Sequence, residues 1–152
     1  MGEVLEIEEE SITLSNELKT HKNIHLNHSY KILELEDGFA KISINSKKSE
    51  QVDEEGIVYD GSIFSAANFC ALAAVNIKHT FLISAKVEFL NPVKLEDADV
   101  IFEATASVNS SGKKNISVTG KVNEITIFSG DFVAMKLDNQ SIIKPSKPKK
   151  RE

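Results

Sequence analysis

The sequence predicts an α+β domain in which a long antiparallel β-sheet wraps around one central helix. The segment 62–76 is apolar on nearly every face, and short alternating runs lie before and after it. A helix that is apolar all round is enclosed by protein or lipid, and this one is too short to span a bilayer. Short hairpin links make a sheet antiparallel, and the helix is then its most economical core.

Two of the alternating runs precede the helix. They cover 30–36 and 39–45, and Asp37-Gly38 between them is a strong hairpin signal. The upstream segment 12–24 is mostly polar with scattered apolar residues, which predicts a weak helix or a docking arm. Asp60-Gly61 marks the start of the central helix, where Ser62 is the expected cap.

Four further strand-like runs follow the helix and are rich in valine, isoleucine, phenylalanine and threonine. They cover 81–90, 100–108, 115–122 and 125–137. Turn signals separate them at Asn91-Pro92, at 110–112 and at Asn123-Glu124. The predicted order is therefore two strands, one buried helix and four strands.

Composition narrows the classes of function. The chain has 152 residues, of which 41% are hydrophobic, so it is the size of one domain with a real core. Its net charge of −5 argues against a general nucleic-acid binder, because phosphate neutralisation needs a basic face. The single cysteine excludes an internal disulfide. With no spanning apolar run and no secretory leader pattern, we expect a cytoplasmic protein without a membrane span.

The two ends of the chain carry opposite charge. Five glutamates lie within 3–10, and five basic residues lie within 144–151 beside two prolines. We expect an acidic arm with a possible short helix at 1–29, the sheet-and-helix domain at 30–138, and a basic flexible tail at 139–152. A protein-interaction scaffold in which these charged ends bind a partner is one hypothesis for function.

Several stretches resemble, in the right order, the hotdog-fold acyl-CoA thioesterase superfamily. The segment 60–68, DGSIFSAAN, resembles the turn-and-helix motif of PaaI-type thioesterases, and 81–94 resembles their third strand with its aromatic-x-x-Pro ending. The phrases IFSAAN and IFSGDF, the latter at 127–132, are similar to the ligand-binding half of FapR-type bacterial sensors of malonyl-CoA. The resemblance covers 30–138 and implies a hotdog homodimer, possibly a tetramer. It also implies an acyl-CoA as ligand or substrate and no other cofactor.

The departures from the family pattern bear on its chemistry. The family histidine falls on Tyr59, its first glycine on Asp60, and the catalytic carboxylate on Asn68. The arginine that grips malonate in the sensors aligns near Tyr59, and the first thirty residues hold no helix-turn-helix. Backbone N–H groups of Asp60, Gly61 and Ser62 could still polarise a thioester carbonyl. An amide is a negligible base, so Asn68 favours binding without turnover.

Two alternatives stay open at this point. An acyl-CoA thioesterase could use a displaced acid, and the candidates are Asp60, Glu54, Glu55, Glu88 and Asp131. Alternatively, Asn68 could simply bond a strand carbonyl inside the packed fold.

Other residue types contribute weaker signals. Gly112, Lys113 and Lys114 resemble the family's Gly-basic turn and are candidates for the CoA phosphates, or they form a solvated hairpin tip. Cys70 is expected to fill space in the core. The spacing of His21, His25 and His28 would place them on one helical face, but nothing joins them and no metal is predicted. His79 is expected to be structural.

Overall fold

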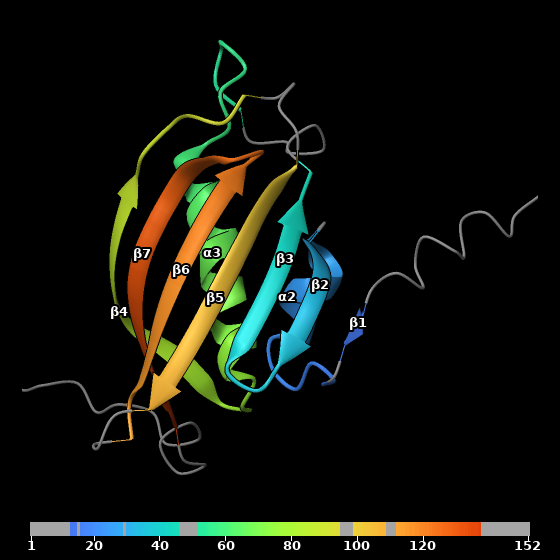
Figure 1. The fold of residues 1–152 in the computed structure, drawn as a ribbon, viewed down its shortest axis with the longest axis vertical. Helices are drawn as coiled ribbons and strands as arrows, with labels where there is room; N and C mark the ends of the chain where they lie inside the picture. Colours follow the sequence, from blue (N-terminus) through green and yellow to red (C-terminus); the bar gives the residue numbers. More distant parts are fainter. Residues whose placement is uncertain are drawn as a thin grey trace, which may run out of the picture.

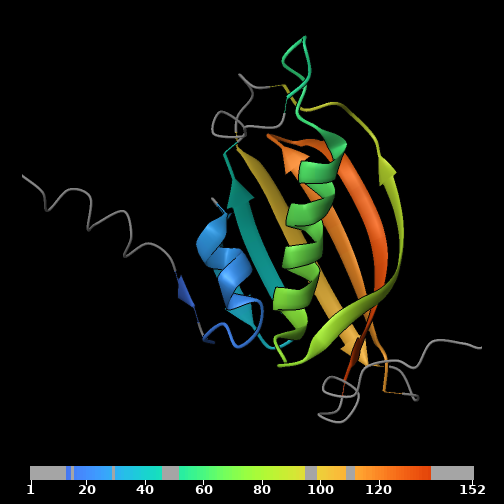
Figure 2. The same ribbon diagram turned by 180° about the vertical axis from the view of Figure 1, so that it is seen from behind.

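One long helix packs against the inner face of a curved sheet (Figures 1 and 2). The computed structural model describes residues 13–14, 16–28, 30–45, 52–94, 99–108 and 112–137. The elements are β1 Thr13–Leu14, α2 Lys22–Asn27, β2 Tyr30–Glu36, β3 Phe39–Ile44, α3 Asp60–Val75, β4 Thr80–Phe89, β5 Val100–Val108, β6 Lys114–Val122 and β7 Ile125–Lys136. The predicted order of two strands, helix and four strands is confirmed, with the short β1 and α2 added upstream.

The strands form one sheet in the order β1-β2-β3-β5-β6-β7-β4. All neighbours are antiparallel except β1 and β2, which run parallel. The chain leaves α3, crosses to the far side of the sheet and forms β4 there. Within the described residues β4 is therefore an edge strand, and β1 lies at the opposite edge.

The core lies between α3 and the middle strands. Phe102, Phe128 and Phe132 are buried beneath the helix, which approaches them closely because alanines occupy much of its surface. Cys70 is also fully buried, and its Sγ lies 3.5 Å from the Ala40 carbonyl oxygen. This packing places the apolar helix against the inner face of its own sheet, as the sequence predicts.

The start of α3 differs from the expectation that Ser62 caps it. The helix begins at Asp60, and Tyr59 is the N-cap without a side-chain cap bond. The Tyr59 carbonyl accepts the N–H groups of Ser62 at 3.0 Å and Ile63 at 3.4 Å. The Tyr59 ring lies against Gly61, where a Cβ would come within 2.4 Å of the ring.

An arm of residues 16–28 is fastened to the C-terminal end of α3. Asn76, in a left-handed conformation with φ 53°, accepts the Lys19 N–H at 2.7 Å through Oδ1. Its Nδ2 donates to the Glu17 carbonyl at 2.9 Å. The His25 ring of α2 stacks on Phe69 of α3 at a centroid distance of 5.8 Å. The arm thus covers the β2 side of the helix (Figure 2).

The expected helix within 12–24 lies instead at Lys22–Asn27. The acidic segment 3–10 and the basic tail 139–152 fall outside the described residues. No helix in the described part of the chain is long and apolar enough to cross a membrane.

Candidate ligand site

One flank of α3 is not fully covered by the rest of the chain. Gly61, Phe64, Ser65 and Asn68 are all exposed to some degree, whereas Ile63, Ala66, Ala67 and Phe69 between and beside them are buried. At about 100° per residue these four positions form a single stripe. The Phe64 ring stacks on Phe132 of β7 at 5.8 Å, so the stripe lies on the β7–β4 side, opposite the arm.

Asn68 lies in the middle of this stripe with an unused hydrogen-bonding atom. Its Oδ1 is buried and accepts no hydrogen bond from any described residue. Burying an amide oxygen without a donor costs about 1–3 kcal/mol, so such atoms are rare in folded proteins. The structural alternative, in which Asn68 bonds a neighbouring strand, finds no support in the contacts of the described residues.

The N-terminal end of α3 supplies further polar groups. The N–H groups of Asp60 and Gly61 donate to no described residue, as expected for the first residues of a helix. Tyr59, 61% exposed, lies beside them. A cavity of about 280 Å³ adjoins this end and is lined by Val52, Asp53, Ile57, Val58, Tyr59 and Asp60.

The inner face of β4 forms the opposite wall of the uncovered region. Phe89 pairs with Phe128, and Ala85 pairs with Phe132, so both side chains lie on the same face as these core rings. Yet Phe89 is 43% exposed and Ile83 on the same strand is 39% exposed, and Leu90 just beyond the strand is 48% exposed. Sequence reasoning missed this apolar wall, although its alternating pattern was the signal that could have found it.

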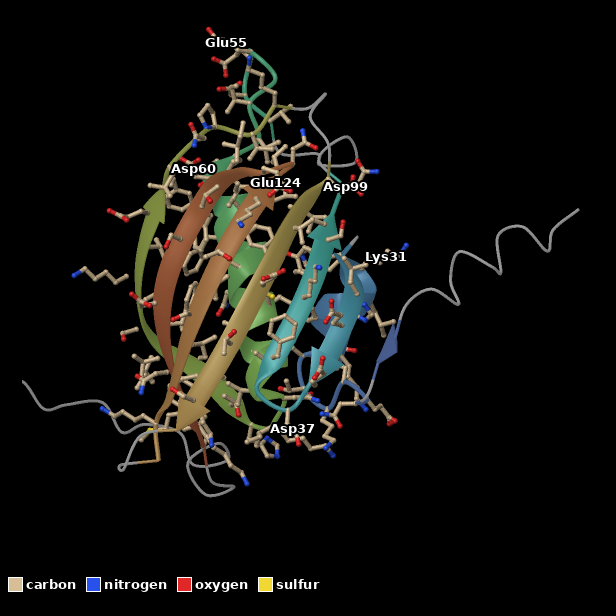
Figure 3. The ribbon with its side chains drawn as sticks, in the orientation of Figure 1. Lys31, Asp37, Glu55, Asp60, Asp99 and Glu124 are labelled. Atoms are coloured by element: carbon tan, nitrogen blue, oxygen red, sulfur yellow. The ribbon has the colours of Figure 1, made fainter. Side chains whose placement is uncertain are left out.

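The predicted acids do not gather at the stripe. Glu54 and Glu55 belong to a hairpin of residues 52–58 that projects beyond the helix start, and Figure 3 shows Glu55 at its tip. Glu88 pairs with Ser129, and Asp131 pairs with Ser117, both on the outer face of the sheet. Of the five candidates, only Asp60 lies at the start of α3.

Gly112, Lys113 and Lys114 lie at the other end of the molecule from Asp60. Gly112 has φ 85°, as a tight turn requires, and Lys114 opens β6. Lys114 lines a second cavity of about 280 Å³ together with Asn76 at the C-terminal end of α3. A sixteen-residue helix is about 24 Å long. Within one chain, the two predicted halves of the site are therefore separated by the length of the helix.

The histidines do not form the single helical face that their spacing suggested. His21 precedes α2 in a left-handed conformation, and only His25 lies within the helix. Burial lowers the pKa of His21 below its ordinary value. No group of three or more potential metal ligands occurs among the described residues. The His79 carbonyl accepts the Leu137 N–H at 2.7 Å, so its backbone links β7 to the start of β4.

Cys70 is placed as expected for a core residue. Desolvation by complete burial raises the pKa of its thiol well above the usual range. The thiolate is the reactive form of cysteine, so this side chain is chemically inert in the folded protein.

The element order, the wrapped helix and the edge strand together define a hotdog fold. A hypothetical thioesterase from Streptococcus pneumoniae, solved with coenzyme A, shares this fold with a TM-score of 0.64 at 15% identity. That likeness covers 74% of this chain and 93% of the thioesterase.

Two other solved structures are more similar to this chain, across most of their own length. Cj0977, a sigma28-regulated virulence protein from Campylobacter jejuni, is 31% identical, with a TM-score of 0.74 over 81% of this chain and 95% of its own. An HP0420 homologue from Helicobacter felis is 30% identical, with a TM-score of 0.73 over 86% and 89%. The chain belongs to the family of these proteins.

Two curated proteins are also similar to this chain. Methylthioribose-1-phosphate isomerase from Aquifex aeolicus is 33% identical over 121 residues, which are 80% of this chain. Transcription factor FapR from Shouchella clausii is 33% identical over 105 residues, which are 68% of this chain. The chain spans 26% of the isomerase and 54% of the transcription factor. No family model matches the sequence.

Proposed function

We propose that this protein binds an acyl-CoA or a related acyl thioester on the uncovered flank of α3 and leaves the thioester intact. The observation that carries the proposal is Asn68, whose buried Oδ1 has no donor within the described structure. A ligand amide, such as those of a pantetheine chain, would supply that donor. The free N–H groups of Asp60 and Gly61 would donate hydrogen bonds to the thioester carbonyl at the helix start.

The arrangement lacks what hydrolysis needs. Attack on a thioester requires a carboxylate nucleophile or a base that activates water, and Asn68 is neither. Glu54, Glu55, Glu88 and Asp131 are directed elsewhere, which leaves Asp60 as the acid of the enzymatic alternative. Asp60 is exposed in the first helical turn, where a negative charge is stabilised by the helix dipole without any catalytic role.

The similar proteins support a ligand of this class. The Streptococcus pneumoniae fold relative was solved with coenzyme A, and the FapR relative is a transcription factor. A binding site without a catalytic base suits a sensing or regulatory role, in the manner of FapR-type sensors. We propose the cytoplasm as the location, where such a sensor would meet its ligand.

We also propose that the protein is a homodimer formed through β4. This strand offers a ten-residue edge whose inner face is apolar and exposed. Unpaired edges with exposed apolar side chains are otherwise a liability. A second copy pairing antiparallel along β4 would cover Phe89 and the flank of α3, and so enclose the ligand site.

The test for binding uses the full chain and a panel of acyl-CoAs of different chain length. Thermal shift measures binding, and release of free CoA thiol measures hydrolysis. We expect a ligand-dependent rise in melting temperature without thiol release. Thiol release that persists in Asn68→Ala and disappears in Asp60→Ala would establish the enzymatic alternative. The absence of both signals would leave a protein-interaction scaffold.

The test for the dimer uses light scattering on two matched variants. Ala85→Lys places a charge on the exposed inner face of β4, and Ser84→Lys places the same charge on the outer face. We expect the first variant to be a monomer and the second to stay a dimer. A dimer that tolerates Ala85→Lys would contradict pairing through β4.

A further inference from the structure

The edge strand β4 carries two opposite charges on its outer face (Figures 1 and 2). Lys86 and Glu88 flank Val87, which packs against the core, so both charged side chains point away from α3. Both are exposed, and neither forms an ion pair with a described residue. Charges on an edge strand discourage indiscriminate pairing, but a pair of opposite sign also favours a partner strand with the matching pair.

The backbone of β4 leaves its hydrogen-bonding groups free at alternate residues. The Leu90 N–H donates to the Ile127 carbonyl of β7 at 2.8 Å. Bonded and non-bonded positions alternate along an antiparallel ladder, and β4 pairs with β7 without irregularity in this part. The backbone groups of Ala85, Val87 and Phe89 therefore point to the open edge, where no further described strand lies. An added strand must bond to these three residues.

Charge limits how a second copy can meet this edge. The free backbone groups require a two-fold axis that passes through a residue, and four residues come into question. An axis at Lys86 would place two ammonium groups opposite each other, and an axis at Glu88 would do the same with two carboxylates. An axis at Ala85 brings neither charge opposite the other. An axis at Val87 places each Lys86 opposite the partner's Glu88, which replaces repulsion by two ion pairs.

We propose that β4 pairs with β4 of a second copy about a two-fold axis at Val87, so that Lys86 binds the partner's Glu88 and the partner's Phe89 closes the ligand site. The inference rests on the proposed homodimer and names the residues that meet in it. Residues 84–90 of the two strands face each other in this register.

The same register brings an aromatic ring of the partner to the uncovered flank of α3. Ala85 lies opposite the partner's Phe89 on one side and opposite Phe132 of β7 on the other. Phe132 stacks on Phe64 of the α3 stripe at 5.8 Å. Adjacent strands lie about 4.8 Å apart, so the backbones that carry the two rings are about 10 Å apart across the small Ala85. The partner's Phe89 therefore forms the far wall of the site that holds Asn68.

The first test exchanges the charges. Lys86→Glu, Glu88→Lys and the double variant are compared with wild type in a dilution series at low salt, followed by analytical ultracentrifugation. Each single variant turns two ion pairs into two like-charge pairs, so we expect dimerisation to weaken by about tenfold or more. The double variant restores both pairs and should dimerise like wild type. Lys121→Glu and Glu124→Lys, the same reversals at exposed residues away from β4, should change dimerisation little.

Restoration by the double variant is specific to the axis at Val87. With an axis at Lys86, Glu88→Lys alone would have no effect, and with an axis at Glu88, Lys86→Glu alone would have none. Lys86→Glu also faces Asp131 within its own chain, but this repulsion persists in the double variant and cannot produce the rescue. A double variant that dimerises no better than the single variants would refute the register, as would a monomeric wild type.

The second test asks which chain's Phe89 serves a given site. A chain with Phe89→Ala and a chain with Asn68→Leu are co-expressed with different affinity tags, and the heterodimer is titrated with octanoyl-CoA. If Phe89 closes the partner's site, one site of the heterodimer keeps both residues and the other loses both. We expect wild-type affinity at half the wild-type stoichiometry. Weak binding at both sites would show that Phe89 serves its own chain and would refute its role across the dimer.

The two tests keep the register and the proposed function distinguishable. Rescue by charge exchange without binding of octanoyl-CoA or any other acyl-CoA of the panel would retain the register and refute the proposed function. Acyl-CoA binding without rescue would refute the register and retain the proposed function.

Discussion

Replacing Asn68 by leucine should stabilise the ligand-free protein and weaken its ligand binding. In the described structure the Asn68 Oδ1 is buried without a donor. The variant removes this cost and fills the same space with an apolar side chain. The two effects have opposite signs because the amide is suited to a ligand and not to the fold.

The magnitude follows from the unpaired oxygen. A buried acceptor without a donor costs about 1–3 kcal/mol, which the leucine recovers. In a chain of this size each kcal/mol corresponds to about 2–4 °C in melting temperature. Loss of the amide contact should weaken acyl-CoA binding by about tenfold or more.

The assay is urea unfolding together with acyl-CoA thermal shift on the same samples. Ser65→Ala, on the exposed part of the same helical stripe, is the control and should change the free energy of unfolding little. If Asn68→Leu destabilised the protein by more than about 1 kcal/mol, the amide would have a structural partner. The argument for a ligand at Asn68 would then fail.

Three further predictions concern the fold. Asn76→Ala loses two hydrogen bonds to the arm and places alanine at φ 53°. It should therefore lower the free energy of unfolding, measured in urea, by about 2–4 kcal/mol and make the arm sensitive to protease. Asn76→Gly should recover part of this loss, because glycine tolerates the left-handed conformation. Gly120→Ala would place a Cβ 2.7 Å from the Phe102 ring, which is enclosed in the core. The free energy of unfolding should therefore fall by about 1–3 kcal/mol. An unchanged melting curve would contradict this packing. Burial lowers the pKa of His21 from 6.5, so the unfolded chain takes up the proton first as the pH drops. Stability should therefore fall as the pH drops through 6.5 toward the folded pKa. Melting temperatures measured against pH should show this dependence, and His21→Gln should flatten it.

The main architecture was predictable because its signals are local and repeat along the chain. The hairpin between β2 and β3 turns at Asp37-Gly38, with Gly38 at φ 78° as such a turn requires. The last hairpin turns at Asn123-Glu124, with Asn123 at φ 56°. The apolar segment 62–76 could be buried on all sides only if strands enclosed it.

The remaining features depend on contacts between distant parts of the chain. The arm is fixed by Asn76, which lies 57 residues from its partner Lys19, and no local pattern announces that pairing. The candidate site was predicted in part: Asn68 and the helix start lie on one flank, whereas Lys114 lies at the other end of the helix.

The arm and β4 together set a limit on assembly. A sheet with two open edges can add copies at both sides and grow without end, as fibres do. Here β1 occupies the β2 edge, and the Asn16 N–H donates to the Leu35 carbonyl at 3.1 Å just beyond it. The chain itself thus covers part of the β2 edge. In the proposed dimer, growth through the β4 edge would stop after a single addition, because the two paired β4 strands would leave no further strand to pair there.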